Sequence, residues 1–159
     1  MKEIQLTNGG VALVDDEDFG EINCFKWFAH KEHGVIYAWR HQYNGYRKYG
    51  AMKMHRQIMK AKTGEILDHA DRNGLNNQKS NLRFCSNSQN LCNTRIRNNN
   101  TSGFKGVSYH RQNKRWRATI NKGGKQVSLG CYGTPAEAAL AYNRKATELF
   151  GEFARPNVT

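Results

Sequence analysis

Three side chains between positions 68 and 90 have the types needed to activate water beside a divalent cation. Asp68 and Asn90 carry oxygen atoms, which are the ligands that a hard cation such as Mg²⁺ or Mn²⁺ prefers. His69 carries an imidazole, whose intrinsic pKa suits it to take a proton from an attacking water. Two protein oxygens would leave coordination positions for water and for a phosphate. The chemistry to consider is therefore hydrolysis of a phosphodiester bond.

The elements around these residues must bring them together. Adjacent residues in a strand point to opposite faces, so a site that needs both Asp68 and His69 has to lie at a strand end or a sharp turn. Turn-forming Asn73-Gly74 follows closely. We expect a strand at residues 66–70, a loop, and a returning strand at residues 81–85. A helix through residues 89–93, with Ser86 or Ser88 as its N-cap, should follow.

Residues 66–94, ILDHADRNGLNNQKSNLRFCSNSQNLCNT, resemble the ββα-metal core of HNH homing endonucleases. The phage group in which the last His is replaced by Asn is the most similar in layout. The resemblance implies that Asp68 and Asn90 ligate Mg²⁺ or Mn²⁺ and that His69 is the general base. It also implies that Asn81 braces the loop and orients His69. Residues 53–59, which include Met54-His55-Arg56, are similar to the helix that precedes this core.

Each of these residues also has a purely structural interpretation. His69 alone could be an ordinary strand histidine, and Asn81 and Asn90 could be turn and cap residues in an Asn-rich chain. Asn87 competes with Asn90 as a ligand, but Asn90 fits the resemblance better. His55 could be a second base or ligand, although packing on a helix face or a phosphate contact fits its position better.

The positive charge is concentrated in the middle of the chain. The formal net charge is +12, from 25 Lys and Arg against 13 Asp and Glu. Residues 1–71 hold 10 of each sign, whereas residues 72–136 hold 12 Lys and Arg and no acidic residue. Binding of DNA or RNA there would release counterions. The alternatives are a solvated basic face or an anionic membrane surface, but aromatic residues and Gly-rich turns between the charges favour nucleic acid.

The C-terminal third predicts three strands and a helix. The strands are expected at residues 105–109, 115–121 and 126–132, with a hairpin turn at 122–125. Thr134 should cap the helix, with Pro135 at its first position and Glu137 at its third. Trp116 alternates with outward-facing Arg115 and Arg117, so it fits the core better than a base-stacking role.

Residues 103–153 resemble an APETALA2-type domain, through Lys105-Gly106-Val107, Arg115-Trp116, Leu129-Gly130-Cys131-Tyr132, Thr134 to Ala139, and Ala141-Tyr142. The resemblance implies a three-stranded sheet in the major groove of double-stranded DNA with a helix packed behind it. Ser108, His110 and Ser128 stand where plant members often carry arginine or tryptophan, so the plant target sequence does not transfer. Candidate DNA contacts are Lys105, Ser108, His110, Arg111, Lys114, Arg115, Arg117, Lys122, Lys125, Arg83, Arg95 and Arg97.

The N-terminal part predicts a small β-rich region. Strands are expected near residues 4–6, 11–14, 25–30 and 35–40, a turn at 15–18, and a helix at 53–62. The four cysteines form no CxxC pair, and we expect them to be buried and reduced. An apolar signal core and a bilayer-spanning run are both lacking, which favours the cytoplasm. The resemblance to phage endonucleases implies a bacterial or phage-infected cell and association with the nucleoid.

Together these patterns predict an α+β protein with three parts. Residues 1–97 hold the β-rich region and the nuclease core (about 53–95), residues 98–102 a linker, and residues 103–159 the DNA-reading module. The expected function is a metal-dependent, homing-type DNA endonuclease that leaves 5′-phosphate and 3′-hydroxyl ends, as a monomer or a dimer. The alternative is a non-catalytic, sequence-specific DNA-binding regulator. An RNA-binding protein is less well supported, because no aromatic RNA-stacking signature occurs.

Overall fold

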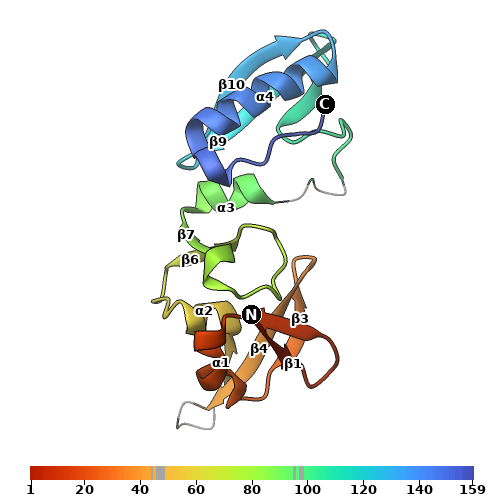
Figure 1. Ribbon diagram of the computed structural model, residues 1–159. Helices are drawn as coiled ribbons and strands as arrows, with labels where there is room; N and C mark the ends of the chain where they lie inside the picture. Colours follow the sequence, from red (N-terminus) through yellow and green to blue (C-terminus); the bar gives the residue numbers. More distant parts are fainter. Residues whose placement is uncertain (44, 46–48, 95, 97–98) are drawn as a thin grey trace. The chain divides into compact units, whose positions relative to one another are not determined.

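The computed structural model describes all residues except 44, 46–48, 95 and 97–98. The chain divides into two compact units, Met1–Cys85 and Ser86–Thr159. Each unit contains both helices and antiparallel strand pairs, so the α+β class is confirmed (Figure 1).

The first unit holds three small antiparallel sheets and short helices. The sheets are β1-β2, β3-β4-β5 and β6-β7. The elements in chain order are β1 (Lys2–Gln5), β2 (Val11–Val14), α1 (Asp16–Asn23), β3 (Phe28–Glu32), β4 (Val35–Tyr43), β5 (Tyr49–Lys53), α2 (Met54–Ile58), β6 (Ile66–His69), the 3-10 helix η1 (Lys79–Asn81) and β7 (Leu82–Cys85).

One apolar core joins the N-terminal strands to the strand pair that carries Asp68 and His69. Ile4, Val14, Trp27 and Met54 are almost fully buried in it, and Leu82 of β7 belongs to the same cluster. The Trp27 indole N–H donates to the Ile22 carbonyl at 2.8 Å, so the buried polar atom is satisfied. The N-terminal residues therefore form the scaffold of β7.

Two expectations for this unit are wrong in detail. The acidic stretch at 15–18 does not form a turn: α1 begins at Asp16, and its first turn holds Asp16, Glu17 and Asp18. Carboxylates favour a helix N-terminus because they face its unpaired N–H groups and its positive dipole end. The helix expected at 53–62 is only α2: Lys53 is the last residue of β5, and the helix ends at Ile58, just before Lys60 with its positive φ of 49°.

The second unit is a three-stranded sheet covered on one face by a long helix (Figure 1). The strand order is β10-β9-β8, and both pairings are antiparallel. The elements in chain order are α3 (Asn87–Asn93), β8 (Val107–His110), β9 (Arg115–Lys122), β10 (Lys125–Tyr132), α4 (Pro135–Phe150) and the 3-10 helix η2 (Gly151–Phe153).

Small side chains let α4 lie close to the sheet. Val107, Ala118, Ala138 and Ala139 form the buried cluster, with Trp116 packed against it. The expected cap is confirmed, because the Thr134 side chain accepts from the Glu137 N–H at 3.2 Å and Pro135 is the first helical residue. The core interpretation of Trp116 agrees with this packing.

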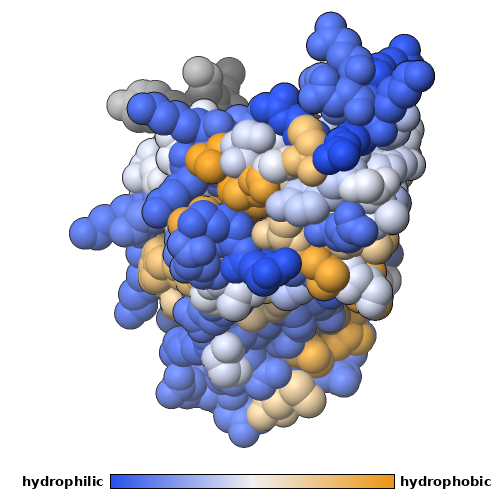
Figure 2. Space-filling model, turned by 90° about the horizontal axis from the view of Figure 1, so that it is seen from above, coloured by the Kyte–Doolittle hydropathy of each residue, from blue (hydrophilic) through white to orange (hydrophobic). Residues whose placement is uncertain are grey.

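The surface is polar, and the cysteines differ in exposure. On the face shown in Figure 2, hydrophilic residues predominate and the hydrophobic ones form small separate patches.

All four cysteines are free, but only Cys92 is buried and Cys24 is exposed, which corrects the expectation that all of them are buried. None of the helices in the described part of the chain combines the length and apolar character that crossing a bilayer requires.

Candidate active site and DNA-binding face

Strand β6 ends at the residue pair that the site needs. Asp68 and His69 are the last two residues of β6, and their exposed fractions are 7% and 5%. The Arg72 N–H donates to the His69 carbonyl at 2.9 Å, so the chain turns immediately after His69. A strand end therefore supplies the break in alternation that two neighbouring functional side chains require.

The Asp68 carboxylate is paired with Arg83. The two residues are directly opposite in the β6-β7 register, and Arg83 Nε and Nη2 donate to Asp68 Oδ2 at 3.1 and 2.8 Å. Their side chains are 8% and 17% exposed, so each compensates the desolvated charge of the other. The sequence analysis placed Arg83 among the DNA contacts, whereas the structure directs its guanidinium to this ion pair.

Asn81 braces the loop that joins β6 to η1, as expected. Its Nδ2 donates to Asp71 Oδ1 at 2.9 Å and to the Asn76 carbonyl at 2.8 Å, and its Oδ1 accepts from the Asp71 N–H at 3.0 Å. Burial acts to raise the pKa of Asp71, but the hydrogen bonds from Asn73, Asn76 and Asn81 outweigh it and hold the pKa below its usual value. The loop is therefore a hydrogen-bonded unit around a carboxylate.

The His69 ring lies among residues that the sequence analysis did not assign to the site. Its Nε2 is 3.5 Å from Oδ1 of Asn77, which is fully buried. The ring centroids of His55 and Tyr37 lie 4.9 and 5.7 Å from that of His69. From the sequence, Asn77 was interpreted only as a turn residue. Its position in the Asn76-Asn77 pair, next to the motif, is the signal that could have assigned it to the site.

Burial keeps both imidazoles neutral. Desolvation lowers the pKa of His69, although Asn77 and the carboxylates of Asp71 and Asp68 oppose the shift. Desolvation and the neighbouring His69 lower the pKa of His55 to about 3, and its Nδ1 is buried without a hydrogen-bond partner. A neutral His69 can accept a proton. His55 packs against it on the buried side, in line with the packing interpretation.

The N-terminal region holds this loop in place. Strand β2 docks against it, because Leu13 N–H donates to the Leu75 carbonyl and Asn77 N–H donates to the Leu13 carbonyl, both at 2.8 Å. The Asp15 carboxylate accepts from the Lys79 N–H at 2.7 Å. A side chain at Gly74 would come within 2.4 Å of the Ile36 carbonyl oxygen, so only glycine permits this approach of the loop to β4.

Helix α3 carries Asn90 and belongs to the second unit, whereas Asp68 belongs to the first. Ser86 is its N-cap, with a full capping box to Gln89. Asn90 is half-buried and Asn87, the rival ligand, is exposed at the first helical position. Among the described residues, no group of three or more His, Cys, Asp or Glu side chains is arranged to hold a metal. The carboxylate and amide oxygens of Asp68 and Asn90 remain the donor set with suitable chemistry for a hard cation.

The sheet face opposite α4 carries several of the expected DNA contacts. Ser108 is the cross-strand partner of Arg117, and His110 is that of Arg115. Direct partners share a face, and Ala118, which follows Arg117 in the strand, is buried on the other one. Arg111 and Lys114 lie in the β8-β9 turn, and Lys122 and Lys125 flank the β9-β10 turn; all four are exposed. Arg95 and Arg97 lie outside the described residues.

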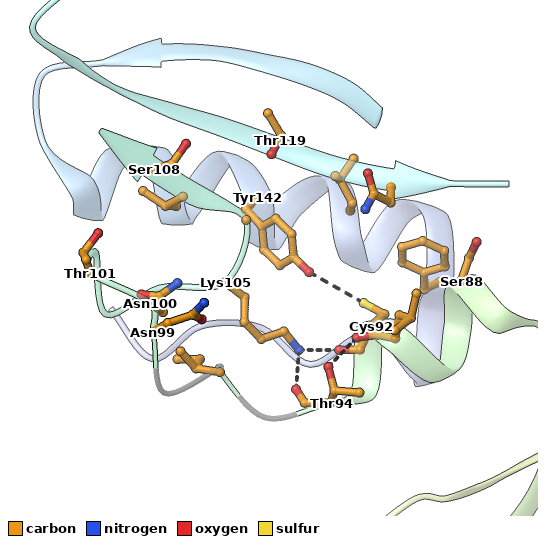
Figure 3. A pocket seen from close by; sticks show the side chains of 17 residues that line it. Ser88, Cys92, Thr94, Asn99, Asn100, Thr101, Lys105, Ser108, Thr119 and Tyr142 are labelled. Carbon is orange, nitrogen blue, oxygen red and sulfur yellow. Dashed lines mark hydrogen bonds between the residues drawn. The ribbon is translucent and has the colours of Figure 1, made fainter. Parts of the chain in front are cut away.

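Lys105 differs from the other candidate DNA contacts in the direction of its side chain. Its Nζ donates to the carbonyls of Cys92 and Thr94, at the C-terminal end of α3 (Figure 3). The residue was expected to contact phosphate, but the ammonium is instead directed into the protein.

Known proteins resemble both the part of the chain that holds Asp68 and His69 and the part that holds the three-stranded sheet. The AP2 domain family matches residues 102–152. An uncharacterized HNH endonuclease of Acanthamoeba polyphaga mimivirus is 36% identical over 156 residues, which cover 94% of this chain and 75% of that protein. Protein 3.8 of Escherichia phage T7 is 36% identical over 112 residues, covering 67% of this chain and 92% of that protein.

The plant relatives match only about a third of the chain. An AP2-like ethylene-responsive transcription factor of Arabidopsis thaliana is 44% identical over 52 residues, covering 31% of this chain and 15% of that protein. The full-length similarity to the viral protein and the AP2 match together show that this chain belongs to the HNH endonuclease family and carries a C-terminal AP2 domain.

Proposed function

We propose that this protein is a metal-dependent, homing-type endonuclease that hydrolyses phosphodiester bonds in double-stranded DNA. The observation that carries the proposal is the arrangement at the end of β6, where buried His69 follows Asp68 and is backed by a braced loop. A braced, neutral imidazole is what a general base requires, because it must be both oriented and unprotonated.

In this proposal His69 takes the proton from the water that attacks phosphorus. Asn77, the edge-on ring of His55 and the tilted ring of Tyr37 restrict its orientation. Asn81 acts through the loop, since its hydrogen bonds are to Asp71 and Asn76 and its carbonyl fixes Ala70. The products would carry 5′-phosphate and 3′-hydroxyl ends.

Asp68 and Asn90 are the proposed ligands of one Mg²⁺ or Mn²⁺ ion. Their oxygen atoms match the preference of these cations. When bound, such an ion would stabilise negative charge on the phosphate and on the leaving 3′ oxygen. Arg83 holds the Asp68 carboxylate in place by its charge-assisted hydrogen bonds.

The AP2 domain would choose where the DNA is bound. Arg115 and Arg117 on the exposed sheet face are the proposed base or phosphate contacts, and Arg111, Lys114, Lys122 and Lys125 around it are the proposed phosphate contacts. With one HNH core per chain, a monomer is expected to nick one strand, and a double-strand cut would need a second copy.

A non-catalytic DNA-binding regulator is the second candidate. The observation in its favour is the ion pair between Arg83 and Asp68, which already neutralises the proposed ligand. A regulator would need the basic AP2 face but no metal at Asp68.

Nicking of a supercoiled plasmid separates the two candidates. The plasmid should carry the DNA that flanks the gene of this protein, and nicked circles should accumulate with Mg²⁺ or Mn²⁺ and stop when a chelator is added. DNA retardation in a gel, measured in parallel with the chelator present, should persist. Retardation without nicking under any divalent cation would favour the regulator, and nicking that continues with the chelator would exclude the metal role.

A further inference from the structure

The C-terminal end of α3 is held by a cation from the AP2 domain. Lys105 Nζ donates to the Cys92 carbonyl, and to the Thr94 carbonyl at 3.0 Å. Figure 3 shows the Lys105 side chain extended toward these two residues, away from the labelled Ser108 and Thr119. We refer to Lys105 with its two carbonyl acceptors as the helix clamp.

The clamp fits the chemistry of a helix end. The last carbonyls of a helix have no partner within it, and they form the negative end of its dipole, so an ammonium is a suitable partner. Helix α3 has only seven residues, and isolated helices of that length are unstable in water. Its order must therefore come from contacts outside the helix.

The backbone of Lys105 is fixed on the AP2 side. Its N–H donates to Asn157 Oδ1 at 2.7 Å, and Asn157 Nδ2 donates back to the Lys105 carbonyl at 3.2 Å. Asn157 is 8% exposed and is bonded to Asn143 of α4 at 2.6 Å. A Cβ at Gly106 would come within 2.2 Å of the Tyr142 ring, which shows how closely this segment lies against α4.

Two further contacts attach α3 to the same domain. Ser88 Oγ, near the N-terminal end of the helix, accepts from the Gly123 N–H of the β9-β10 turn at 3.1 Å. Cys92 Sγ lies 4.0 Å from the Tyr142 hydroxyl and is 4% exposed. The helix that carries Asn90 is thus packed on the AP2 domain at both ends.

We propose that Lys105 is a positioning residue for catalysis: its clamp fixes α3, and with it Asn90, on the AP2 domain. The inference rests on the proposed function, because it gives Asn90 the role of a metal ligand. Movement of the AP2 domain on DNA would then be transmitted to the ligand through Lys105. The rival is that Lys105 contacts a DNA phosphate.

The two roles predict different effects of Lys105→Met. If Lys105 is a positioning residue, kcat at saturating DNA should fall on the order of tenfold or more, because a displaced Asn90 would hold the metal ion in the wrong place for the reaction. The Mg²⁺ concentration for half-maximal nicking should rise. As a phosphate contact, Lys105 should matter for affinity: Kd should rise, and the salt dependence of binding should weaken by roughly one unit of slope. The comparison variant is Lys125→Met, which removes the same charge from a proposed phosphate contact at an exposed position of the same domain and should therefore show the second pattern, a raised Kd and a weaker salt dependence.

Alkylation of Cys92 tests the clamp without nuclease activity. Cys92 is buried, and burial raises the pKa of its thiol, so the intact protein should react slowly at this position. Release of the helix end should speed iodoacetamide labelling of Cys92 roughly tenfold, because local opening governs access. Cys131 serves as the internal reference in peptide mass spectrometry. Lys105→Arg, which keeps donors for the carbonyls, should restore both slow labelling and turnover.

The outcomes separate the clamp from the proposed function. Wild-type protein that never nicks DNA refutes the proposed function, and with it any catalytic meaning of the clamp. Wild-type protein that nicks, with Lys105→Met matching it in kcat and in Cys92 labelling, refutes the positioning role alone. Loss of DNA binding in Lys105→Met well beyond that in Lys125→Met would also refute it, because Lys105 would then serve binding or folding of the domain.

Discussion

The two units of this chain use polar residues in opposite ways. Met1–Cys85 has nearly balanced charge, with 13 Lys and Arg against 10 Asp and Glu, and among its described residues it buries His55, Asp68, His69, Asn77 and Asn81. Ser86–Thr159 has 12 Lys and Arg against 3 acidic residues. Among its described residues it buries no histidine or acidic side chain but two amides, Asn93 and Asn157, and a cluster of small apolar side chains lies under its basic face.

The difference reflects two physical tasks. Buried polar groups need partners, and satisfying them fixes their orientation, which catalysis requires. Exposed cations stay hydrated and adaptable, which suits attraction of a polyanion. The first unit therefore has the properties of a reaction centre and the second those of a binding surface. The four predictions below test that division.

Removal of the proposed base should have the largest effect. His69→Ala should lower the nicking rate by roughly 10²- to 10⁴-fold, the usual contribution of general-base catalysis, while DNA affinity stays within about twofold because the basic face is elsewhere. His33→Asn, a change of an exposed histidine in the same unit with a left-handed backbone, is the control. Normal cutting by His69→Ala would disprove its assignment.

Breaking the buried ion pair should destabilise the first unit. Arg83→Met leaves the Asp68 carboxylate desolvated without its partner, which should cost about 3–5 kcal/mol of unfolding free energy in urea. Lys62→Met, at an exposed position, should change it little. A double variant with Asp68→Asn should recover much of the loss, because the unpaired charge is gone. Stability equal to wild type in Arg83→Met would show that the pair is not a structural element.

Acid should destabilise the first unit more than the second. The pKa of His55 is about 3 in the folded protein against 6.5 for an unperturbed histidine, so below pH 6.5 the unfolded state binds the extra proton. The contribution of neutral His55 to the free energy of unfolding is fully present above pH 6.5. As the pH falls from 6.5 toward the folded pKa, this contribution decreases by about 1.4 kcal/mol per pH unit. The lowered pKa values of His69 and Asp71 act with the same sign.

Calorimetry at pH 7 and pH 4.5 measures this effect. The second unit holds one of the six histidines, His110, and its transition should move less. His55→Phe should remove part of the acid sensitivity of the first transition. Equal shifts of both transitions would contradict the division between the units.

Loss of one arginine from the basic face should have the smallest effect. Arg117→Ala should weaken DNA binding about tenfold and reduce the salt dependence by roughly one unit of slope, without changing turnover at saturating DNA. Arg144→Ala removes the same charge from an exposed position of α4, the helix behind the sheet, and should change affinity little. Equal effects of both variants would assign binding to net charge and not to the sheet face.

Local patterns predicted the second unit well. Alternation in residues 115–121, the hairpin turn and the Thr134 cap are signals between near neighbours, and the structure has β9, β10 and α4 at those places. The strand, loop, strand and helix around Asp68 were also predicted, and of the two candidate caps, Ser86 and Ser88, the structure uses Ser86. The N-terminal region was predicted less well, because β5 pairs with β4 through long-range contacts and acidic residues 15–18 allow either a turn or a helix N-terminus.

The sequence by itself determined which residue types stand at the end of β6, where the positive charge is concentrated and which strands form the DNA-reading sheet. Only the tertiary structure decided the partners: Arg83 pairs with Asp68, Asn77 lies against His69, β2 holds the loop and Lys105 clamps α3. The physical reason is that a side chain reveals what it can bind, whereas burial and cross-strand register choose its partner from residues far along the chain.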